Sequence, residues 1–387
     1  MALLAIASPS LYRTPAPPGE ARPRRAHPRV AVVYPISFGA AGIYGGGERY
    51  ALELAKALAR RVPTRLIDFA DGARRSQEDG LEIHTYAPRR HVHGHPLNPL
   101  SFGFLRSLLG VDVVHCLTWN TLVTDFSILA AKVTGKKVFV TDVGGGASLT
   151  LNRRLPLARW VDRFLLIVPQ GGAQFETHRD RWTIILAGVD TETYRPAPDV
   201  SRRGVLFVGR LLPHKGINYL IEAVGPETPL TLAGRPYHDE YFALLRRLSV
   251  GKDVTFRLDA SDEEIVALYR TSAVSVLPSV NETIYGDRFD LPELLGFAAM
   301  EAMACGTPVI CSRVGGLGEL VVDGVTGFLV PPNDPVALRA RILELTGDPA
   351  RAAAMGAAAR ARILETFTWD QVAERCLEAY GGAEGER

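Results

Sequence analysis

Short runs of apolar, β-branched residues alternate with longer stretches of helical periodicity along most of the chain. The first run, RVAVVYP at 29–35, leads into the glycine-rich loop FGAAGIYGGGE, and a helix is expected from about Glu48 to Arg61 because apolar residues recur there at helical spacing. Further runs that fit buried strands lie at 111–117, 136–142 and 164–169. This alternation predicts a parallel sheet covered on both faces.

The same pattern restarts after a polar stretch with two prolines at 189–204. A strand at 205–210 and a helix at 217–224 come first, and the later apolar runs lie at 230–234, 253–258, 272–279 and 307–312. Two α/β domains are therefore predicted, over residues 29–195 and 200–368, and ligands in such sheets bind beyond the carboxyl ends of the strands. Residues 1–28, rich in Pro and Arg, are expected to form a flexible lead-in.

Length and composition agree with a two-domain globular protein. The chain has 387 residues, which is more than one typical hydrophobic core contains. Its apolar fraction of 47% is ordinary for a soluble protein. No apolar stretch reaches the length of a membrane span, and no secretory signal is evident, so a cytoplasmic location is expected. The four cysteines lack paired CxxC spacing, and buried, inert thiols are predicted.

Charge is distributed unevenly. Residues up to Arg195 contain 25 Lys and Arg against 16 Asp and Glu, whereas the remainder contains 19 against 26. The basic excess, much of it in pairs such as Arg153-Arg154, is either solvated surface or a region that meets an anionic membrane or an anionic acceptor. Nucleic acid is disfavoured because no basic stretch carries interleaved aromatic residues.

The stretch VGRLLPHKG at 208–216 directly follows a predicted strand. Gly209 allows tight backbone geometry, and Arg210 and Lys215 could direct two cations to one point near a helix N-terminus, which would suit a phosphate group. Many loops contain an Arg and a Lys, so this segment alone is weak evidence.

A second stretch, PELLGFAAMEAMACGTPVI at 292–310, carries two carboxylates. Pro292 and Glu293 suit the first turn of a helix that would place Glu293 and Glu301 about 12 Å apart along its axis and about 80° apart around it. That spacing exceeds the roughly 5–9.5 Å of a glycosidase pair and fits an elongated polar ligand. Gly296 would let such a ligand approach unpaired backbone N–H groups.

The alternative is structural: Glu293 caps the helix and Glu301 pairs with an arginine. However, two cations that suit phosphates and two carboxylates that suit hydroxyls together describe a nucleotide-diphosphate sugar.

At this point the sequence resembles the retaining glycosyltransferases of family 4, which have the GT-B fold of two Rossmann-like domains facing each other across a cleft. The matching stretches are GGGERYALELAKAL (45–58), GVDTETYRP (188–196), VGRLLPHKGINYLIEA (208–223), the Glu-x7-Glu segment with EAMACGTPVI (301–310), GGLGELVVDGVTGFLVPPND (315–334) and FTWDQVAERCLEAY (367–380).

The resemblance implies a role for each candidate residue. Arg210 and Lys215 would bind the donor diphosphate, Glu293 the transferred sugar and Glu301 the ribose. Further substrate contacts would come from Gly45, Gly46, Gly209, Gly296 and Phe297. The family generally needs no metal and no cofactor, because cations and a helix N-terminus neutralise the leaving diphosphate. A final helix within 369–387 usually crosses back onto the first domain.

The sequence departs from the family pattern at two places. Many relatives have a histidine at the position of Leu117, and here His115 is interpreted as structural, whereas Asp142 is either a substitute polar group or part of a turn. The segment 281–292 is longer than usual and could shape sugar specificity or cover the site.

The leading hypothesis is a hexosyltransferase that moves a sugar from a UDP- or GDP-linked donor to a hydroxyl acceptor in glycan, polysaccharide or glycolipid synthesis. The expected partners are that donor and a glycan, lipid-linked or small-molecule acceptor. A non-catalytic nucleotide- or glycan-binding module on the same scaffold is the competing class. A dinucleotide-dependent oxidoreductase is disfavoured because YGGGERY lacks the G-x-G-x-x-G spacing.

Overall fold

The computed structural model describes residues 27–37, 45–144, 149–198 and 200–382. The predicted lead-in at 1–28 falls outside this part except for its last two residues. The glycine-rich loop at 38–44, two of the three glycines after Val143 and the end of the chain also lie outside it.

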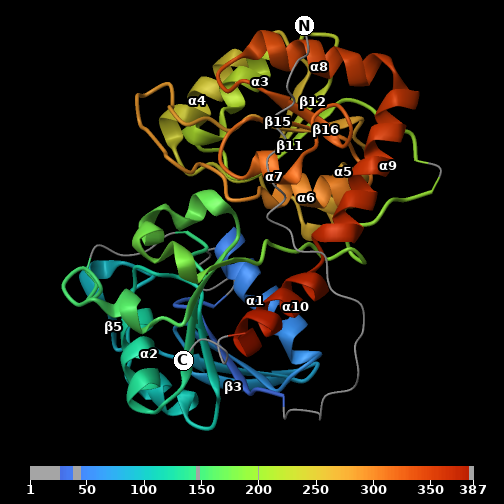
Figure 1. Ribbon diagram of the computed structural model, residues 1–387. Coiled ribbons are helices and arrows are strands. Elements are labelled where there is room, and N and C mark those ends of the chain that lie inside the picture. Colours follow the sequence, from blue (N-terminus) through green and yellow to red (C-terminus); the bar gives the residue numbers. More distant parts are fainter. Residues whose placement is uncertain (1–26, 38–44, 145–148, 199, 383–387) are drawn as a thin grey trace, which may run out of the picture.

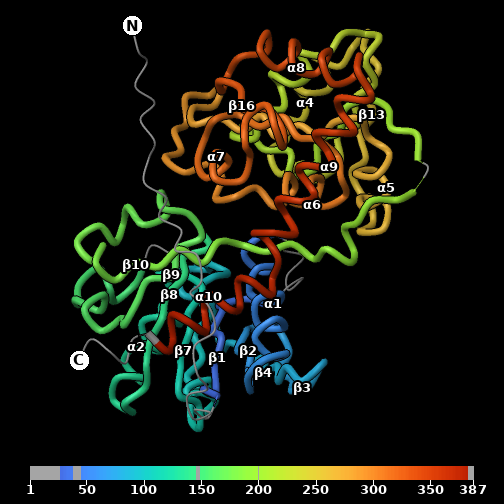
Figure 2. Tube along the Cα trace, turned by 45° about the vertical axis from the view of Figure 1, so that its right-hand side comes forward, coloured from blue at the N-terminus to red at the C-terminus, as the bar shows by residue number. Residues whose placement is uncertain are grey.

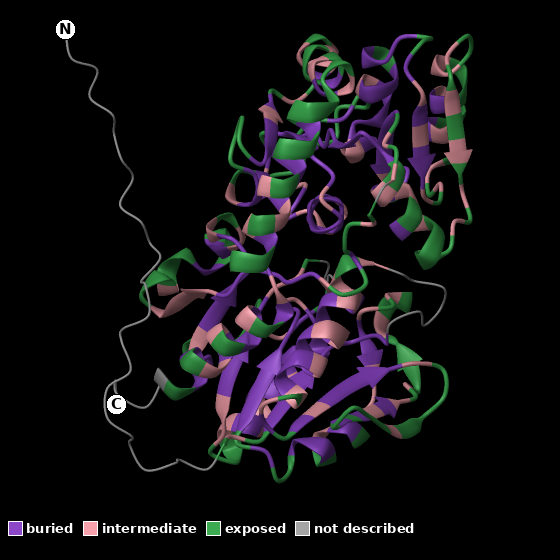
Figure 3. Cartoon of the chain, turned by 90° about the vertical axis from the view of Figure 1, so that its right-hand side faces the viewer, coloured by how far each residue is buried: buried purple, intermediate pink, exposed green. Residues whose placement is uncertain are grey.

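The first domain is built on a sheet that has eight strands among the described residues, in the order β10-β9-β8-β7-β1-β2-β4-β3. All neighbours are parallel except β3 and β4. The strands are β1 (Val30–Val33), β2 (Thr64–Phe69), β3 (Arg74–Glu78), β4 (Leu81–Tyr86), β7 (Val113–Cys116), β8 (Lys137–Val140), β9 (Arg163–Leu166) and β10 (Trp182–Ile184). Figure 3 shows how completely the inner strands are buried.

Helices cover both faces of this sheet. The helices α1 (Gly46–Ala59) and α10 (Trp369–Gly382) pack against each other on one face, and α2 (Leu122–Val133) packs on β7 and β8. Smaller elements surround α2 and the sheet edge, namely β5 (Arg90–His91), β6 (Pro99–Leu100), η2 (Val92–Gly94), η3 (Gly103–Leu108), η4 (Leu157–Trp160) and η5 (Pro169–Arg181).

The second domain has a sheet of six strands within the described residues, all parallel, in the order β13-β12-β11-β14-β15-β16. Its strands are β11 (Val205–Val208), β12 (Leu230–Ala233), β13 (Val254–Arg257), β14 (Val274–Leu277), β15 (Val309–Ser312) and β16 (Gly327–Val330). Its helical elements are η6 (Pro213–Lys215), α3 (Ile217–Ala223), α4 (Asp239–Leu248), α5 (Asp262–Thr271), α6 (Phe297–Ala304), α7 (Leu317–Leu320), α8 (Pro335–Gly347) and α9 (Pro349–Thr366). The predicted fold class, two parallel-sheet α/β domains, is confirmed (Figure 1).

Two crossings between the domains lie within the described residues, and they run side by side at Val189 and Thr368. The backbone N–H of Val189 donates to the carbonyl of Phe367 at 2.9 Å. A side chain at Gly188 would collide with the backbone of Trp369, so the crossings can approach this closely only because residue 188 is glycine. Beyond Trp369, α10 lies on the first domain, as Figure 2 shows, and its Asp370 pairs at 2.7 Å with Arg61, in the turn after α1.

The cysteines are all free and buried, as predicted. Burial raises the pKa of the Cys116 thiol to about 12 and that of Cys311 further. Among the residues that the structure describes, none of the helices combines the length and apolar character that crossing a bilayer requires.

Candidate active site

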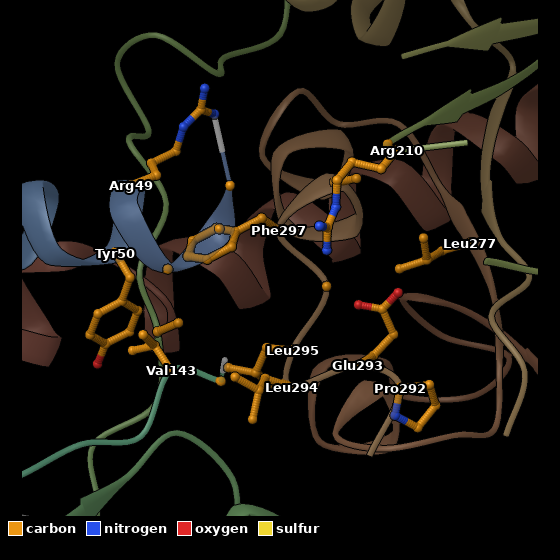
Figure 4. Close-up of a pocket in the computed structure, with 18 of the residues that line it drawn as sticks. Arg49, Tyr50, Val143, Arg210, Leu277, Pro292, Glu293, Leu294, Leu295 and Phe297 are labelled. Atoms are coloured by element: carbon orange, nitrogen blue, oxygen red, sulfur yellow. The ribbon is translucent and has the colours of Figure 1, made fainter. Parts of the chain in front are cut away.

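A cavity of about 490 Å³ lies between the two domains, at the carboxyl ends of strands from both sheets. All nine residues predicted from the sequence to contact substrate line it: Gly45, Gly46, Gly209, Arg210, Lys215, Glu293, Gly296, Phe297 and Glu301. Figure 4 shows the Arg210 and Glu293 side chains directed into the cavity from the second domain, opposite Arg49, Tyr50 and Val143 of the first. The structure therefore brings the predicted set together, while the role of each residue stays a prediction.

The two cations reach the cavity from the loop after β11. The backbone at Gly209 has a φ of 151°, which redirects the chain as it leaves the strand, and Gly216 closes η6 with a φ of 64°. The Arg210 guanidinium is exposed and makes no side-chain hydrogen bond or ion pair with the described part of the chain. It is thus available to an anion that enters the cavity.

Lys215 and Glu293 form an ion pair inside the cavity. The same carboxylate oxygen of Glu293 also accepts from the hydroxyl of Ser279 at 2.7 Å, and the residue is only 7% exposed. Glu293 therefore does not cap a helix, and the alternative in which it does so is wrong.

The predicted helix start at Pro292 is also wrong, because α6 begins at Phe297. Gly296 precedes the helix with a φ of 73°, and a side chain there would collide with Leu277 and Leu317. Glu293 thus lies on an extended loop, so the spacing calculated along one helix axis does not apply to the two carboxylates.

That loop is held in place by the glycine pair 315–316. The N–H of Gly316 donates to the carbonyl of Glu293 at 3.1 Å. A side chain at Gly315, whose φ is 52°, would collide with the same carbonyl, and one at Gly316 would collide with the carbonyl of Leu294. The pair thus positions Glu293, a function that the sequence analysis did not assign to it.

Glu301 is bound by groups from both domains. One carboxylate oxygen accepts from Arg49 of α1 at 2.7 Å, and the other accepts from the hydroxyl of Tyr269 at 2.9 Å. Burial raises the pKa of Glu301, and Arg49 opposes that rise. The predicted alternative of an arginine partner is therefore observed, but Glu301 and Arg49 both also line the cavity.

Sequence reasoning missed Arg49 and His214. Arg49 lies within the quoted stretch GGGERY, but only the fold shows that it reaches across to Glu301. His214 lines the cavity beside Lys215, and burial, followed by the neighbouring Lys215 charge, lowers the pKa of the imidazole to about 4. His214 is therefore neutral near pH 7 and could exchange hydrogen bonds with a substrate.

The first domain contributes mostly backbone to the cavity. Gly45 is the residue before α1, and a side chain on Gly46 would come within 3.1 Å of the Phe297 ring. One on Gly47 would collide with the Tyr34 hydroxyl. Close approach of the domains therefore depends on the lack of a side chain at Gly46, whereas Gly47 leaves room for Tyr34 within the first domain.

The structure clarifies the departures from the family pattern. Leu117 is buried in the core, and His115 lies between the Tyr380 and Thr141 hydroxyls, each at 2.8 Å. The ring is fully buried with both nitrogens hydrogen-bonded, which supports its interpretation as structural, and burial lowers the pKa of His115 to about 3. Asp142 is hydrogen-bonded to Gln174 and, at 3.4 Å, to the backbone of Trp119, so it supports a loop rather than lining the cavity.

The segment 281–292 forms a turn followed by a wall of the cavity. Asn281 and Phe289 exchange hydrogen bonds of 2.7 Å and 2.9 Å, which close the turn. The Phe289 ring lies 4.9 Å from that of His214, and Leu291 and Pro292 line the cavity. Its predicted influence on sugar specificity stays a prediction.

Two parallel-sheet domains with a charged cavity between them define a protein of the GT-B class. Residues 191–362 match the family described as Glycosyl transferases group 1, and residues 44–193 match the one described as Glycosyltransferase Family 4. The two matches run through both domains, and the chain belongs to the family 4 glycosyltransferases, which transfer sugars from nucleotide sugars.

Similar sequences carry several glycosyltransferase names. The D-inositol 3-phosphate glycosyltransferase of Streptomyces avermitilis is 27% identical over 96% of this chain and 91% of its own length. A GDP-mannose-dependent phosphatidylinositol monomannoside mannosyltransferase of Mycolicibacterium smegmatis is 34% identical, but over 50% of this chain and 55% of its own.

Solved structures match over nearly the whole chain. Alr3699/HepE of Anabaena, in complex with UDP and glucose, has a TM-score of 0.72 and 21% identity over 92% of this chain and 100% of that one. Sucrose-phosphate synthase of Thermosynechococcus elongatus has a TM-score of 0.68 and 22% identity over 93% of this chain and 100% of that one. At these identities the matches establish the fold alone.

Proposed function

We propose that the protein is a retaining hexosyltransferase that moves a sugar from a UDP- or GDP-linked donor to a hydroxyl acceptor. One observation carries this proposal: Arg210, Lys215, Glu293 and Glu301 all line one cavity between the domains. Two cations and two carboxylates in one enclosed site match the charges and hydroxyls of a nucleotide-diphosphate sugar. One relative named for a GDP-mannose donor and a structural neighbour with UDP-glucose are consistent with either nucleotide.

In the proposed reaction the donor diphosphate lies against Arg210 and Lys215. Negative charge grows on this group as the bond to the sugar breaks, and fixed cations in a largely enclosed site stabilise it most at that moment. No group of His, Cys, Asp or Glu residues within the described residues has the arrangement of a metal site. We therefore propose that Arg210 and Lys215 supply the positive charge themselves, and activity that survives EDTA treatment would support this.

The carboxylates have different proposed roles. Glu293 accepts hydrogen bonds from hydroxyls of the transferred sugar, because it is held deep in the cavity by Lys215 and Ser279. Glu301 accepts hydrogen bonds from the ribose. The acceptor enters from the first-domain side, along Gly45 to Gly47, and the leaving phosphate takes its proton.

The decisive experiment is a thermal-shift screen against UDP, GDP and ADP sugars, followed by an assay of donor hydrolysis and transfer. A ligand at a hundred times its dissociation constant stabilises the fold by about 2.7 kcal/mol. We expect one donor to stabilise the protein and to be slowly hydrolysed without acceptor. Stabilisation with no hydrolysis or transfer to any acceptor would favour the non-catalytic alternative, and no stabilisation by any nucleotide would overturn both.

A further inference from the structure

The surface around α2 combines unpaired positive charge with exposed apolar side chains. We call it the α2 face and define it as residues 87–109, 122–136 and 149–160, which belong to the helix and the segments packed around it. From residue 87 to 161 the sequence has nine Lys and Arg but only three Asp and no Glu. The α2 face therefore carries a strong excess of basic residues.

None of the three aspartates in this span is available to neutralise that excess. Asp112 is bound by Arg29 at 3.0 Å, Asp125 is completely buried, and Asp142 is held by Gln174. Among the described residues, six exposed arginines of the α2 face have no acidic partner: Arg89, Arg90, Arg106, Arg153, Arg154 and Arg159.

Large apolar side chains are exposed among these arginines. Six of them have exposed fractions between 42% and 88%, namely Phe102, Leu109, Val133, Leu149, Leu155 and Trp160. In the sequence LTLNRRLPLARW at 149–160, three arginines are interspersed among leucines and a tryptophan. Exposed apolar residues gathered among cations usually mark an interaction surface.

Contacts place these segments on one face of the first domain. The elements η3, η4 and β6 all pack against α2, and the rings of Phe102 and Phe126 lie 5.1 Å apart. The Asn98 side chain joins the segments further, since it donates to the carbonyl of Leu149 at 2.9 Å and accepts from the N–H of Leu122 at 2.8 Å. Buried residues from α2, η3 and η4 share one hydrophobic core, separate from the core that holds α1 and α10.

We propose that the α2 face docks on an anionic membrane surface. Arginines are attracted to anionic lipid headgroups, and tryptophan and leucine gain from insertion at the boundary with the acyl chains. A polyanion such as nucleic acid would use the arginines but would leave the exposed leucines unexplained.

The test is sedimentation of the full chain with vesicles of phosphatidylcholine, with and without phosphatidylglycerol. We expect binding only to the anionic vesicles, weakening as salt is added. The triple variant R153E/R154E/R159E should lose roughly tenfold or more in partitioning. Trp160→Ala should also weaken binding, with a salt dependence like that of the wild type, because it removes an apolar contact and no charge.

Matched controls come from the second domain, where Arg246 of α4 and Val250 just after it are exposed. Arg246→Glu and Val250→Ser should bind vesicles like the wild type, and all variants should keep their thermal unfolding temperature and their transfer to a soluble acceptor. Lack of binding by the wild type, or equal losses in the control variants, would overturn the proposal. Binding to an oligonucleotide but not to vesicles would also overturn it and would assign the face to a polyanion.

Discussion

The two walls of the cavity present different chemical groups. The second-domain wall presents charged side chains, Arg210, Lys215 and Glu293, from loops after its strands. The first-domain wall presents glycine backbone and apolar side chains, and Arg49 is its one ionised side chain in the described lining, from which residues 38–44 and 145–148 are left out.

This difference separates two kinds of recognition. A diphosphate and its sugars can be recognised by charge and hydroxyl contacts, which need particular residue types. A wall of glycine backbone and apolar side chains, where the acceptor is proposed to bind, selects mainly by shape, which different side chains can produce. The residue types in the sequence therefore point to the donor and say little about the acceptor.

The largest expected effect is loss of a cation from the charged wall. Arg210→Ala should lower turnover by about 10²–10³, because it removes one preorganised charge from the transition state. Its unfolding temperature should stay unchanged, since the guanidinium is exposed and unpaired within the described residues. Arg210 is a cleaner test than Lys215, whose loss would also leave Glu293 buried without its ion-pair partner.

The matched control is Arg246→Ala, which removes an exposed arginine from α4 and should keep full activity. Wild-type turnover in Arg210→Ala would remove the assignment of the diphosphate site.

The next largest effect on turnover is expected from the glycine pair 315–316, which supports the loop that carries Glu293. Gly315→Ala should displace the loop that carries Glu293, because the new side chain collides with its carbonyl and the backbone there has positive φ. Strain of this kind costs about 1–3 kcal/mol, and we expect roughly a tenfold loss of turnover or more. Kinetic assay and thermal unfolding of the variant measure both effects.

Gly318 is a control in the same stretch, since a side chain there meets no atom within 4 Å. Gly318→Ala should leave turnover unchanged and the fold as stable as before or slightly more so. If both variants behaved alike, the glycine pair would not position Glu293.

A smaller effect is expected from the charged residue of the other wall. Arg49→Gln removes the cation that opposes the rise in the pKa of Glu301. Protonated Glu301 accepts fewer hydrogen bonds, so the donor KM of this variant should increase as the pH falls. For each unit by which the variant raises the pKa of Glu301, its donor KM at a pH below that pKa should exceed the wild-type value by roughly tenfold. The pH profile of donor KM measures this, and Arg49→Lys should restore most of the wild-type profile. A variant with a lower donor KM than the wild type would show that Arg49 competes with the donor instead.

The smallest effect on activity is expected at His115, behind the first-domain wall. Its pKa is lowered to about 3 in the folded protein by burial, against about 6.5 when unfolded. The unfolded chain therefore binds a proton that the folded chain does not, and stability is lost as the pH falls below about 6.5, by about 1.4 kcal/mol per unit.

The unfolding temperature should accordingly fall less between neutral and mildly acidic pH for His115→Gln than for the wild type. Turnover near neutral pH should change little. A large loss of turnover with normal stability would indicate that His115 acts on the substrate.

The sequence was sufficient for the fold class and for the set of residues around the cavity. It failed at Glu293, because Leu294 and Leu295 fit a helical pattern although they belong to a loop, in which Leu295 is buried and Leu294 partly buried. Gly296 and the distant glycine pair 315–316 decide whether that segment is a helix. Local periodicity takes neither of them into account. Arg49 was missed for a similar reason, since its partner Glu301 lies 252 positions further along the chain. The strands β2 and β4 were not singled out because charged and polar residues interrupt their apolar positions (TRLIDF and LEIHTY), whereas the equally short strands that were predicted are mostly continuous apolar runs.

The paired crossings at Val189 and Phe367 have a consequence for motion. The two crossings between the lobes that the described residues contain are joined by a backbone hydrogen bond between Val189 and Phe367, which opposes sliding of one lobe past the other. A rigid-body rotation would instead pivot at this joint, and opening would carry Arg49 away from Glu301 while leaving the fold of each lobe intact.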